Sequence, residues 1–289
     1  MSPAEPGVGC VPAVSTALFD GYPRASAMAE LAAAGVAAVE PAYIPGYMDF
    51  DETAFSDAAA AELRRCLAAE GLRASALSGH VNLGEAEAVE KIRRRIGFAA
   101  NIGAAIVVSN AAPQSQRGPF LDNLNRIVPH CEAAGVVLAL ENPGHGTNAI
   151  VADAASGMAV VDAFASPWLR LNYDLGNVFT YSGERRRPED DVAAALPGVA
   201  QFHVKDVRSE GGDWAFTAIG DGSLGYRGIA GRLARLAPDI PVCLELPLRL
   251  WRPGRGDPER RPTPVPLDTI RTALRRSLAF WSMAFRADG

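Results

Sequence analysis

Four short apolar segments decide the fold: VVLALEN (residues 136–142), LRLNYD (169–174), VAQFHVKD (199–206) and PVCLELP (241–247). Each is rich in apolar or β-branched residues and is bounded by turn-forming residues, which is typical of a buried parallel strand. Successive segments lie roughly thirty to forty residues apart, and a strand-helix-strand crossover needs about thirty residues. The four segments therefore predict consecutive strands of one parallel sheet.

Each of these segments carries, at or near its end, a side chain that can bind a metal: Glu141, Asp174, His203 and Glu245. Consecutive parallel strands would deliver all four to one end of the sheet. A charged side chain at the end of a buried strand is costly unless it is paired or bound to a metal. Three carboxylates and one imidazole suit Mn²⁺, Mg²⁺, Co²⁺ or Zn²⁺ and need no thiolate. The pattern predicts a cation site, although any single carboxylate could instead cap its strand and pair with an arginine.

Composition restricts the class of protein. The chain has 289 residues, 48% of them hydrophobic and 21% charged, which is ordinary for a globular protein. Its net charge of −5 argues against nucleic acid as a partner and favours a small neutral or carbonyl-bearing substrate. The four cysteines form no CxxC pair. We expect a cytoplasmic protein without a membrane partner, because neither a secretory signal nor a long apolar run occurs.

The whole chain alternates short apolar runs with longer Ala-, Leu- and Arg-rich segments, as expected of a parallel α/β fold. Eight strands close such a sheet into a (β/α)8 TIM barrel, here predicted as a single domain over residues 1–289. Several predicted helices end at a glycine, where a left-handed cap residue is favoured. The predicted strands are 11–17, 36–40, 73–78, 105–109, 136–141, 169–174, 200–204 and 242–246, and the predicted helices are 25–34, 56–70, 85–102, 116–134, 152–164, 188–196, 228–236 and 267–286.

Two insertions interrupt this alternation, near 207–227 and 248–266. The first is polar and rich in glycine, and the second contains five arginines among several prolines. Because loops that follow barrel strands lie on the catalytic face, both are candidate walls or lids of a substrate site. Solvated insertions or contacts within an oligomer would explain them equally well.

The motifs at the segment ends resemble those of a known group. The motifs LENP (140–143), NYDLGN (172–177), FHVKD (202–206) and LELP (244–247), in this order, look like the xylose-isomerase-like superfamily of sugar isomerases and epimerases. That superfamily includes ketose 3-epimerases, inosose dehydratases, hydroxypyruvate isomerases and, more distantly, endonuclease IV. The resemblance extends over nearly the whole chain, because SGH (78–80) and AANIGA (99–104) also look typical.

The resemblance implies a (β/α)8 barrel with one divalent ion, often Mn²⁺, held by Glu141, Asp174, His203 and Glu245. In the epimerases of this superfamily, one metal-bound glutamate removes a proton next to a carbonyl and the other returns a proton on the far side, through an enediolate. Glu141 and Glu245 match these two positions. The leading hypothesis is therefore a metal-dependent isomerase or epimerase of a ketose or related hydroxy-carbonyl compound.

Further residues are candidates for substrate binding. Lys205 lies two residues after His203, so strand alternation directs it to the same side of the sheet, where it could hold an oxyanion or form a structural ion pair with Asp206 or another carboxylate. His80 is a candidate for substrate binding or acid/base work, against a purely structural role. His145, Asn177 and Arg208 are the remaining candidates. Asn177 stands where ketose 3-epimerases commonly have a histidine, and Arg208 is the nearest arginine after the seventh strand. These departures favour the broader set of inosose dehydratase-like and other isomerases.

Other functions compete with the leading hypothesis. A lyase, either a dehydratase or an eliminase of a keto-sugar, keto-glycoside or keto-cyclitol, would use the same metal and base, with Lys205 or His80 assisting the leaving group. A nuclease resembling endonuclease IV would need more histidines than the four present and a less acidic chain. A non-catalytic barrel would have to retain four ligands without using them. Relatives are often dimers or tetramers, which makes a homo-oligomer an expectation by analogy.

Overall fold

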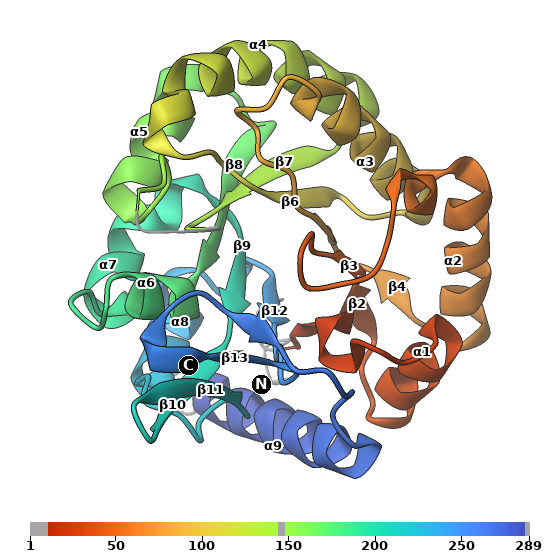
Figure 1. Ribbon diagram of the computed structural model, residues 1–289, viewed down its shortest axis with the longest axis vertical. Coiled ribbons are helices and arrows are strands. Elements are labelled where there is room, and N and C mark those ends of the chain that lie inside the picture. Colours follow the sequence, from red (N-terminus) through yellow and green to blue (C-terminus); the bar gives the residue numbers. More distant parts are fainter. Residues whose placement is uncertain (1–10, 144–147, 287–289) are drawn as a thin grey trace, which may run out of the picture.

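The computed structural model describes residues 11–143 and 148–286, and its centre is a parallel sheet surrounded by helices (Figure 1). The order of the strands in this sheet is β3-β5-β6-β7-β8-β9-β12-β1-β2-β4. Its strands are β1 (Ala13–Ser15), β2 (Ala38–Glu40), β3 (Ala42–Tyr43), β4 (Arg73–Ala74), β5 (Leu77–Gly79), β6 (Ile106–Asn110), β7 (Val137–Glu141), β8 (Leu169–Asp174), β9 (Val199–Val204) and β12 (Val242–Leu244).

The sheet closes on itself. Only Pro41 separates β2 from β3, and only Ser75 and Ala76 separate β4 from β5, so each pair is one strand with a local break. β2 pairs with β4 and β3 pairs with β5, both in parallel. Every strand therefore has a neighbour on both sides, and the eight predicted strands form the predicted (β/α)8 barrel.

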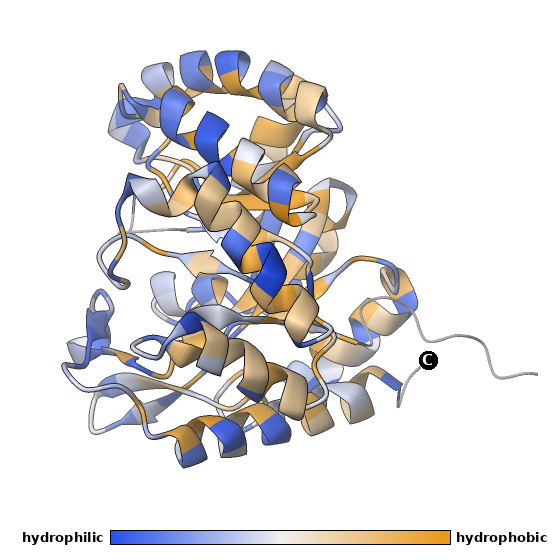
Figure 2. Ribbon diagram, turned by 90° about the vertical axis from the view of Figure 1, so that its right-hand side faces the viewer, coloured by the Kyte–Doolittle hydropathy of each residue, from blue (hydrophilic) through white to orange (hydrophobic). Residues whose placement is uncertain are grey.

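Helices cover the outside of the barrel, as Figure 1 shows. Helix α3 illustrates why: Val89, Ile92, Ile96 and Ala99 are buried at three- and four-residue spacing, which marks one apolar face. Figure 2 shows the same mixture of hydrophobic and hydrophilic residues along the outer helices. The helices are α1 (Arg24–Ala33), α2 (Asp57–Ala69), α3 (Ala88–Ile102), α4 (Arg117–Ala134), α5 (Ala154–Phe164), α6 (Leu175–Tyr181), α7 (Pro188–Ala195), α8 (Tyr226–Leu236) and α9 (Leu267–Arg286).

Most of these boundaries agree with the sequence predictions. The predicted left-handed glycine caps are present, for example at Gly103 (φ 80°) and Gly135 (φ 66°), which end α3 and α4. The first strand is shorter than predicted, because the chain turns into a 3₁₀ helix at Thr16. The short helix α6 was not predicted. The 3₁₀ helices cover Thr16–Phe19, Glu52–Phe55, Gln114–Gln116, Leu196–Gly198 and Pro253–Arg255.

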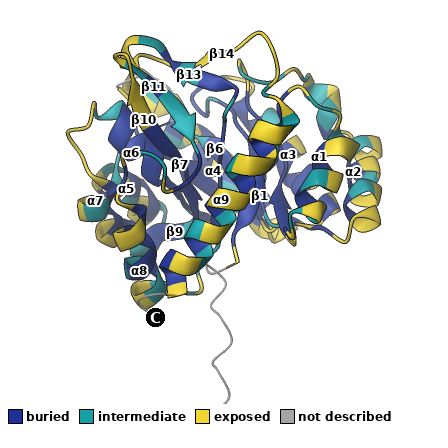
Figure 3. Ribbon diagram, turned by 90° about the horizontal axis from the view of Figure 1, so that it is seen from below, coloured by how far each residue is buried: buried dark blue, intermediate teal, exposed yellow. Residues whose placement is uncertain are grey.

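The two insertions fold together into a second sheet, which sits at one end of the barrel (Figure 3). Its antiparallel order is β10-β11-β13-β14, with β10 (Asp206–Glu210) and β11 (Asp213–Thr217) from the first insertion. The second insertion supplies β13 (Leu250–Arg252) and β14 (Glu259–Arg260). β11 pairs with β13 through Trp214 opposite Arg252. The two insertions therefore form a single four-stranded antiparallel sheet.

An ion-pair cluster fastens the second insertion to the barrel. Asp20, which follows β1 and its 3₁₀ turn, accepts hydrogen bonds from Nε and a terminal nitrogen of Arg260 at 2.8 and 2.7 Å. Arg249 also contacts Asp20, at 3.3 Å, and donates to the carbonyl oxygens of Arg261 and Pro262. Two of the five arginines in this insertion thus hold it against the barrel. Among the described residues, no helix is long and apolar enough to cross a membrane.

Candidate metal centre and active site

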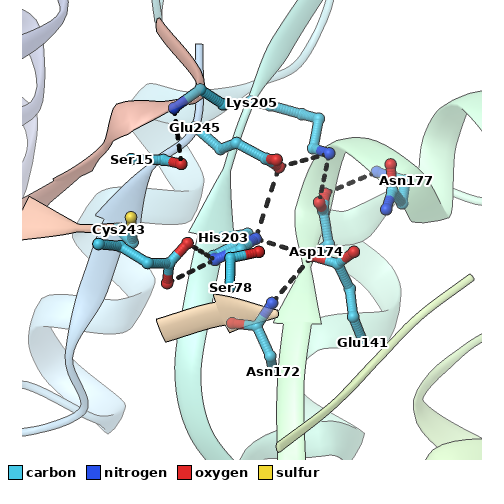
Figure 4. Close-up of polar contacts among 12 residues, drawn as sticks. Ser15, Ser78, Glu141, Asn172, Asp174, Asn177, His203, Lys205, Cys243 and Glu245 are labelled. Carbon is cyan, nitrogen blue, oxygen red and sulfur yellow. Dashed lines mark hydrogen bonds and ion pairs between the residues drawn. The ribbon is translucent and has the colours of Figure 1, made fainter. Parts of the chain in front are cut away.

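The four predicted ligands meet at one end of the barrel. Glu141 ends β7, Asp174 ends β8, His203 lies in β9 and Glu245 directly follows β12. All four side chains are buried, and each offers one ligand atom within 4.8 Å of the others. Figure 4 shows them pointing toward one another from neighbouring strands. The sequence prediction that these residues converge is therefore correct as geometry.

Local hydrogen bonds fix the position of Asp174. Its Oδ1 accepts a hydrogen bond from the backbone N–H of Asn177, which makes it the N-cap of α6. Its own N–H donates to Oδ1 of Asn142, and Nδ2 of Asn142 donates back to its carbonyl oxygen. Gly176 lets this turn pack on the end of β9, because a Cβ atom there would lie 2.6 Å from the carbonyl oxygen of Lys205. Oδ2 of Asp174 is left directed at the centre.

A chain of polar contacts lies beneath the centre and orients His203. Nδ1 of His203 lies 2.7 Å from Oε1 of Glu141, and Nε2 lies 3.0 Å from the carboxylate of Glu40. Gln201 donates to Glu40 at 2.6 Å and to Asn172 at 3.3 Å, and Asn172 donates to Glu141 at 3.0 Å. With its proton on Nε2 and directed at Glu40, the imidazole presents the lone pair of Nδ1 to the centre.

Lys205 reaches the same point. Its Nζ lies 2.8 Å from Oδ2 of Asp174 and 2.5 Å from Oε2 of Glu245. Burial opposes the charge, but Asp174, Glu245 and Glu141 raise the pKa of Lys205 well above its usual range. In return, Lys205 and His203 outweigh burial and hold the pKa of Glu245 below its ordinary value. Lys205 is therefore an ammonium ion within the cluster, and the carboxylates that it pairs with are Asp174 and Glu245. Asp206, the other expected partner, instead accepts hydrogen bonds from the backbone N–H groups of Val207, Gly220, Gly222 and Leu224.

The donor set fits a divalent cation. Four buried carboxylates, from Glu40, Glu141, Asp174 and Glu245, outnumber the three groups that can be cationic, His80, His203 and Lys205. Oδ2 of Asp174, Nδ1 of His203 and Oε2 of Glu245 also lack a well-directed hydrogen bond. Buried polar atoms are rarely left in this state unless something else satisfies them. A divalent cation among these atoms would compensate the excess negative charge, and carboxylate oxygens with one imidazole are suitable ligands.

A small cavity of about 50 Å³ lies over the cluster, bounded by Glu141, Lys205 and Glu245. The second sheet forms its roof, with Phe216, Leu250 and Arg252 among the lining residues. The Arg252 guanidinium stacks 4.3 Å from the Tyr181 ring centroid and 5.1 Å from that of Trp214, and its Nε donates to the carbonyl oxygen of Gly256. The expectation that the insertions form a wall of the site agrees with this lining.

His80 stands at the edge of the cavity. Its Nε2 lies 2.8 Å from Oγ of Ser78 and 3.9 Å from Oε2 of Glu141, and its Nδ1 lies 2.7 Å from Oδ1 of Asn110. It is 3% exposed, so its orientation is fixed by these partners. Asn177 also lines the cavity, although its side-chain amide donates to the carbonyl oxygens of Asn142 and Pro143.

One predicted substrate-binding residue of the described chain is not found in this lining. Arg208 is wrong as a cavity residue: it lies on the exposed part of β10 and pairs with Glu210, because strand alternation in the hairpin directs it outward. Arg252, from the other insertion, is the arginine that lines the cavity. His145 lies outside the described residues.

Sequence reasoning also missed residues that the structure places in or beneath the site. Glu40 ends the second predicted strand, so the signal that identified the four ligands, a charge at the end of a buried strand, could have found it. Asn172 and Gln201 lie inside strands and carry no such signal. Tyr181 and Arg252 belong to segments whose placement depends on tertiary packing.

Comparison with solved structures finds the same fold at low sequence identity. A xylose isomerase-like TIM barrel protein from Mycobacterium smegmatis in complex with magnesium has a TM-score of 0.70 and 16% identity over 97% of this chain and 99% of that one. D-psicose 3-epimerase with D-tagatose from Clostridium cellulolyticum H10 gives 0.72 and 12% over 94% and 98%. The probable 3-DHS dehydratase of petrobactin synthesis from Bacillus anthracis gives 0.67 and 13% over 93% and 97%.

Two comparisons by sequence were made, one with curated proteins and one with family models. No curated protein sequence matches this chain. A family model described as xylose isomerase-like TIM barrel matches residues 28–270, which is most of the sequence. The chain belongs to the xylose isomerase-like TIM barrel family.

Proposed function

We propose that this protein is a divalent-metal-dependent isomerase or epimerase of a ketose or related hydroxy-carbonyl compound, acting by proton transfer at the carbon next to the carbonyl. One observation carries the proposal: Glu141, Asp174, His203 and Glu245 converge within 4.8 Å at one end of the barrel. Solved structures of the same fold include a ketose 3-epimerase and a magnesium complex, which support this class of reaction.

Glu141, Asp174, His203 and Glu245 are the residues that would hold the cation, with Mn²⁺ as the first choice and Mg²⁺, Co²⁺ or Zn²⁺ as alternatives. When bound, such a cation supplies Lewis-acid polarisation of the substrate carbonyl and a template for its neighbouring hydroxyl.

Glu141 and Glu245 are the proposed proton-transfer pair. They enter the cavity from β7 and from the end of β12, two strands that β8 and β9 separate in the sheet. The pKa of each is below its ordinary value despite burial, so either can serve as the base. The unprotonated carboxylate removes the proton, and the other, which must enter the step carrying a proton taken up from solvent, returns that proton on the opposite face.

Lys205 is the proposed electrostatic stabiliser. Its ammonium group lies between Asp174 and Glu245 and lines the cavity, where it can donate to the oxygen on which charge develops. A fixed cation in a site closed to water stabilises such an oxygen far more than it would in solvent.

A lyase is the second candidate, because two groups beside the proposed bases can supply a proton. Nζ of Lys205 is 2.5 Å from Glu245, and Nε2 of His80 is 3.9 Å from Glu141. In a dehydratase or eliminase of a keto-sugar, keto-glycoside or keto-cyclitol, a carboxylate would remove the proton and one of these groups would protonate the departing oxygen. The fold is shared with a probable 3-DHS dehydratase.

Incubation of Mn²⁺-loaded protein with a panel of ketoses in D₂O tests the proposal. Deuterium incorporation next to the carbonyl without loss of mass balance supports the isomerase, and loss of water or of a substituent supports the lyase. Glu141→Gln and Glu245→Gln should each lower turnover by about a hundredfold or more, whereas exposed Glu132→Gln should not. Full activity of both site variants would refute the proposed roles.

A further inference from the structure

The cavity over the proposed metal centre is too small for a whole substrate. Its volume is about 50 Å³, whereas small-molecule sites in proteins usually measure about 300–1,000 Å³. A second pocket of about 600 Å³ lies beside it. His80 and Asn110 line both, so the two volumes meet at this pair of residues. A molecule that occupied both pockets would therefore cross from one to the other at His80 and Asn110.

The larger pocket has an apolar wall. Met48 and Phe50 come from the loop after β3, Val81 follows β5, Ala112 follows β6 and Val151 precedes α5. The ring of Phe50 packs edge-on against Tyr43 and Phe55, so this side of the wall is continuous with the core. A wall made of fixed apolar side chains binds apolar surface by excluding water.

The ionic side chains of this lining are already engaged with protein groups. Arg95 forms an ion pair with Glu52 at 2.9 Å, and Lys91 lies 3.7 Å from Glu85. Asp51 accepts a hydrogen bond from the N–H of Thr53. A phosphate or carboxylate in the pocket would have to compete with these pairs, so the pocket favours a neutral occupant.

We infer that the substrate carries a neutral, mainly apolar substituent, aryl or alkyl in character, that occupies this pocket while its hydroxy-carbonyl part meets Glu141 and Glu245. The inference rests on the proposed function, because that function places the hydroxy-carbonyl part. The molecule is then an extended compound in two parts, and His80 and Asn110 contact the junction between them.

Binding measured by ¹⁹F NMR on the full-length protein tests the pocket separately from the chemistry. The probes are 4-fluorobenzyl alcohol and 6-O-(4-fluorobenzyl)-D-fructose, which keeps the carbonyl and its neighbouring hydroxyls. D-fructose carries no fluorine, so its affinity is measured by its competition with the linked compound and by isothermal titration calorimetry. We expect the linked compound to bind Mn²⁺-loaded protein about tenfold or more tightly than D-fructose, as expected from burial of an aromatic ring. Met48→Asp places a charge in the apolar wall, and Ala112→Leu fills part of the pocket.

Both variants should abolish most of the preference for the linked compound, and Met283→Asp, at an exposed methionine of α9, should preserve it. Met48 is only half-buried, so Met48→Asp remains informative if Ala112→Leu fails to fold. The inference is overturned if the linked compound binds no more tightly than D-fructose, or if its preference survives Met48→Asp. Failure of the proposed function looks different: 4-fluorobenzyl alcohol still binds in a Met48-dependent way, but D-fructose affinity is indifferent to Mn²⁺ and to Glu245→Gln.

Discussion

The carboxylate of Glu40 lies 3.0 Å from Nε2 of His203, and both side chains are fully buried. This contact sets the direction of the imidazole: Nε2 faces Glu40, which would hold its proton, and Nδ1 faces Glu141 and Glu245, where it would be the ligand atom for a cation. A histidine that binds a metal through one nitrogen commonly donates from its other nitrogen to a carboxylate in this way. Glu40 is therefore the proposed positioning residue for His203.

Glu40→Gln should weaken Mn²⁺ binding about 10- to 100-fold, the usual cost of losing such a partner. The glutamine keeps the size of the side chain but removes the charge that fixes the histidine tautomer. Isothermal titration calorimetry of metal-free protein measures the effect, and exposed Glu132→Gln is the control. A variant that melts like the parent protein and binds Mn²⁺ equally tightly would contradict the role of Glu40.

Lys205→Met should separate metal binding from activity. Removing a positive charge next to Asp174 and Glu245 removes repulsion of the cation, so Mn²⁺ affinity should rise by about tenfold. Turnover should fall, because the group proposed to stabilise the developing oxyanion is gone. Calorimetry and the D₂O exchange assay report the two effects on the same sample. Weaker Mn²⁺ binding would instead show that Lys205 supports the geometry of the ligands.

Asp206→Asn should destabilise the loop that follows β11. The two carboxylate oxygens of Asp206 accept hydrogen bonds from the N–H groups of Val207, Gly220, Gly222 and Leu224. An asparagine has only one acceptor oxygen, and its NH₂ group cannot accept a hydrogen bond. Two backbone N–H groups would therefore lose their acceptor, which should lower the free energy of unfolding by about 1–3 kcal/mol. Urea unfolding at pH 7 measures this loss.

The same variant has a predicted pH signature. Burial raises the pKa of Asp206 to about 6, although the hydrogen bonds from backbone N–H groups act to lower it. Because the folded state then holds this proton more tightly than the unfolded chain, with its ordinary value of 3.8, the contribution of Asp206 to stability falls as the pH rises from about 4 to 6. The stability difference between the parent and Asp206→Asn should narrow over that range. A difference that widens with pH would contradict the sign of the shift.

Asp20→Asn should loosen the arginine-rich insertion without unfolding the barrel. Asp20 holds Arg260 through two hydrogen bonds and also contacts Arg249, so its charge fastens both ends of the segment. Limited trypsin digestion should cut residues 249–261 at least severalfold faster in the variant. Asp49→Asn is the matched control, because Asp49 contacts the same Arg260 but is 89% exposed. Equal digestion of the two variants would show that Asp20 does not hold the insertion.

Much of the barrel was predictable because local signals define it. The strand predicted at 136–141 is an apolar run that ends in a glutamate. The helix predicted at 85–102 has one apolar face, which packs on the barrel, and is followed by a glycine cap. The convergence of Glu141, Asp174, His203 and Glu245 follows from the parallel order of the strands. These features depend on neighbours in sequence or on a regular topology.

The roof of the site was not predictable in the same way. The hairpin of β10 and β11 has a local signal, Gly211–Gly212 between alternating residues, which the prediction of a loop did not use. The pairing of Trp214 with Arg252 joins segments far apart in sequence and has no local signal. Position in the sequence after the seventh strand therefore points to Arg208, whereas tertiary pairing brings Arg252 to the cavity.

The most direct test of the central claim is a crystal structure of the protein soaked in Mn²⁺, with anomalous diffraction data that locate the ion. The prediction is a single strong peak at about 2.0–2.6 Å from carboxylate oxygens of Glu141, Asp174 and Glu245 and from Nδ1 of His203. A peak at the neighbouring group of Glu40, His203 and Cys243, or no peak among the four side chains, would contradict it.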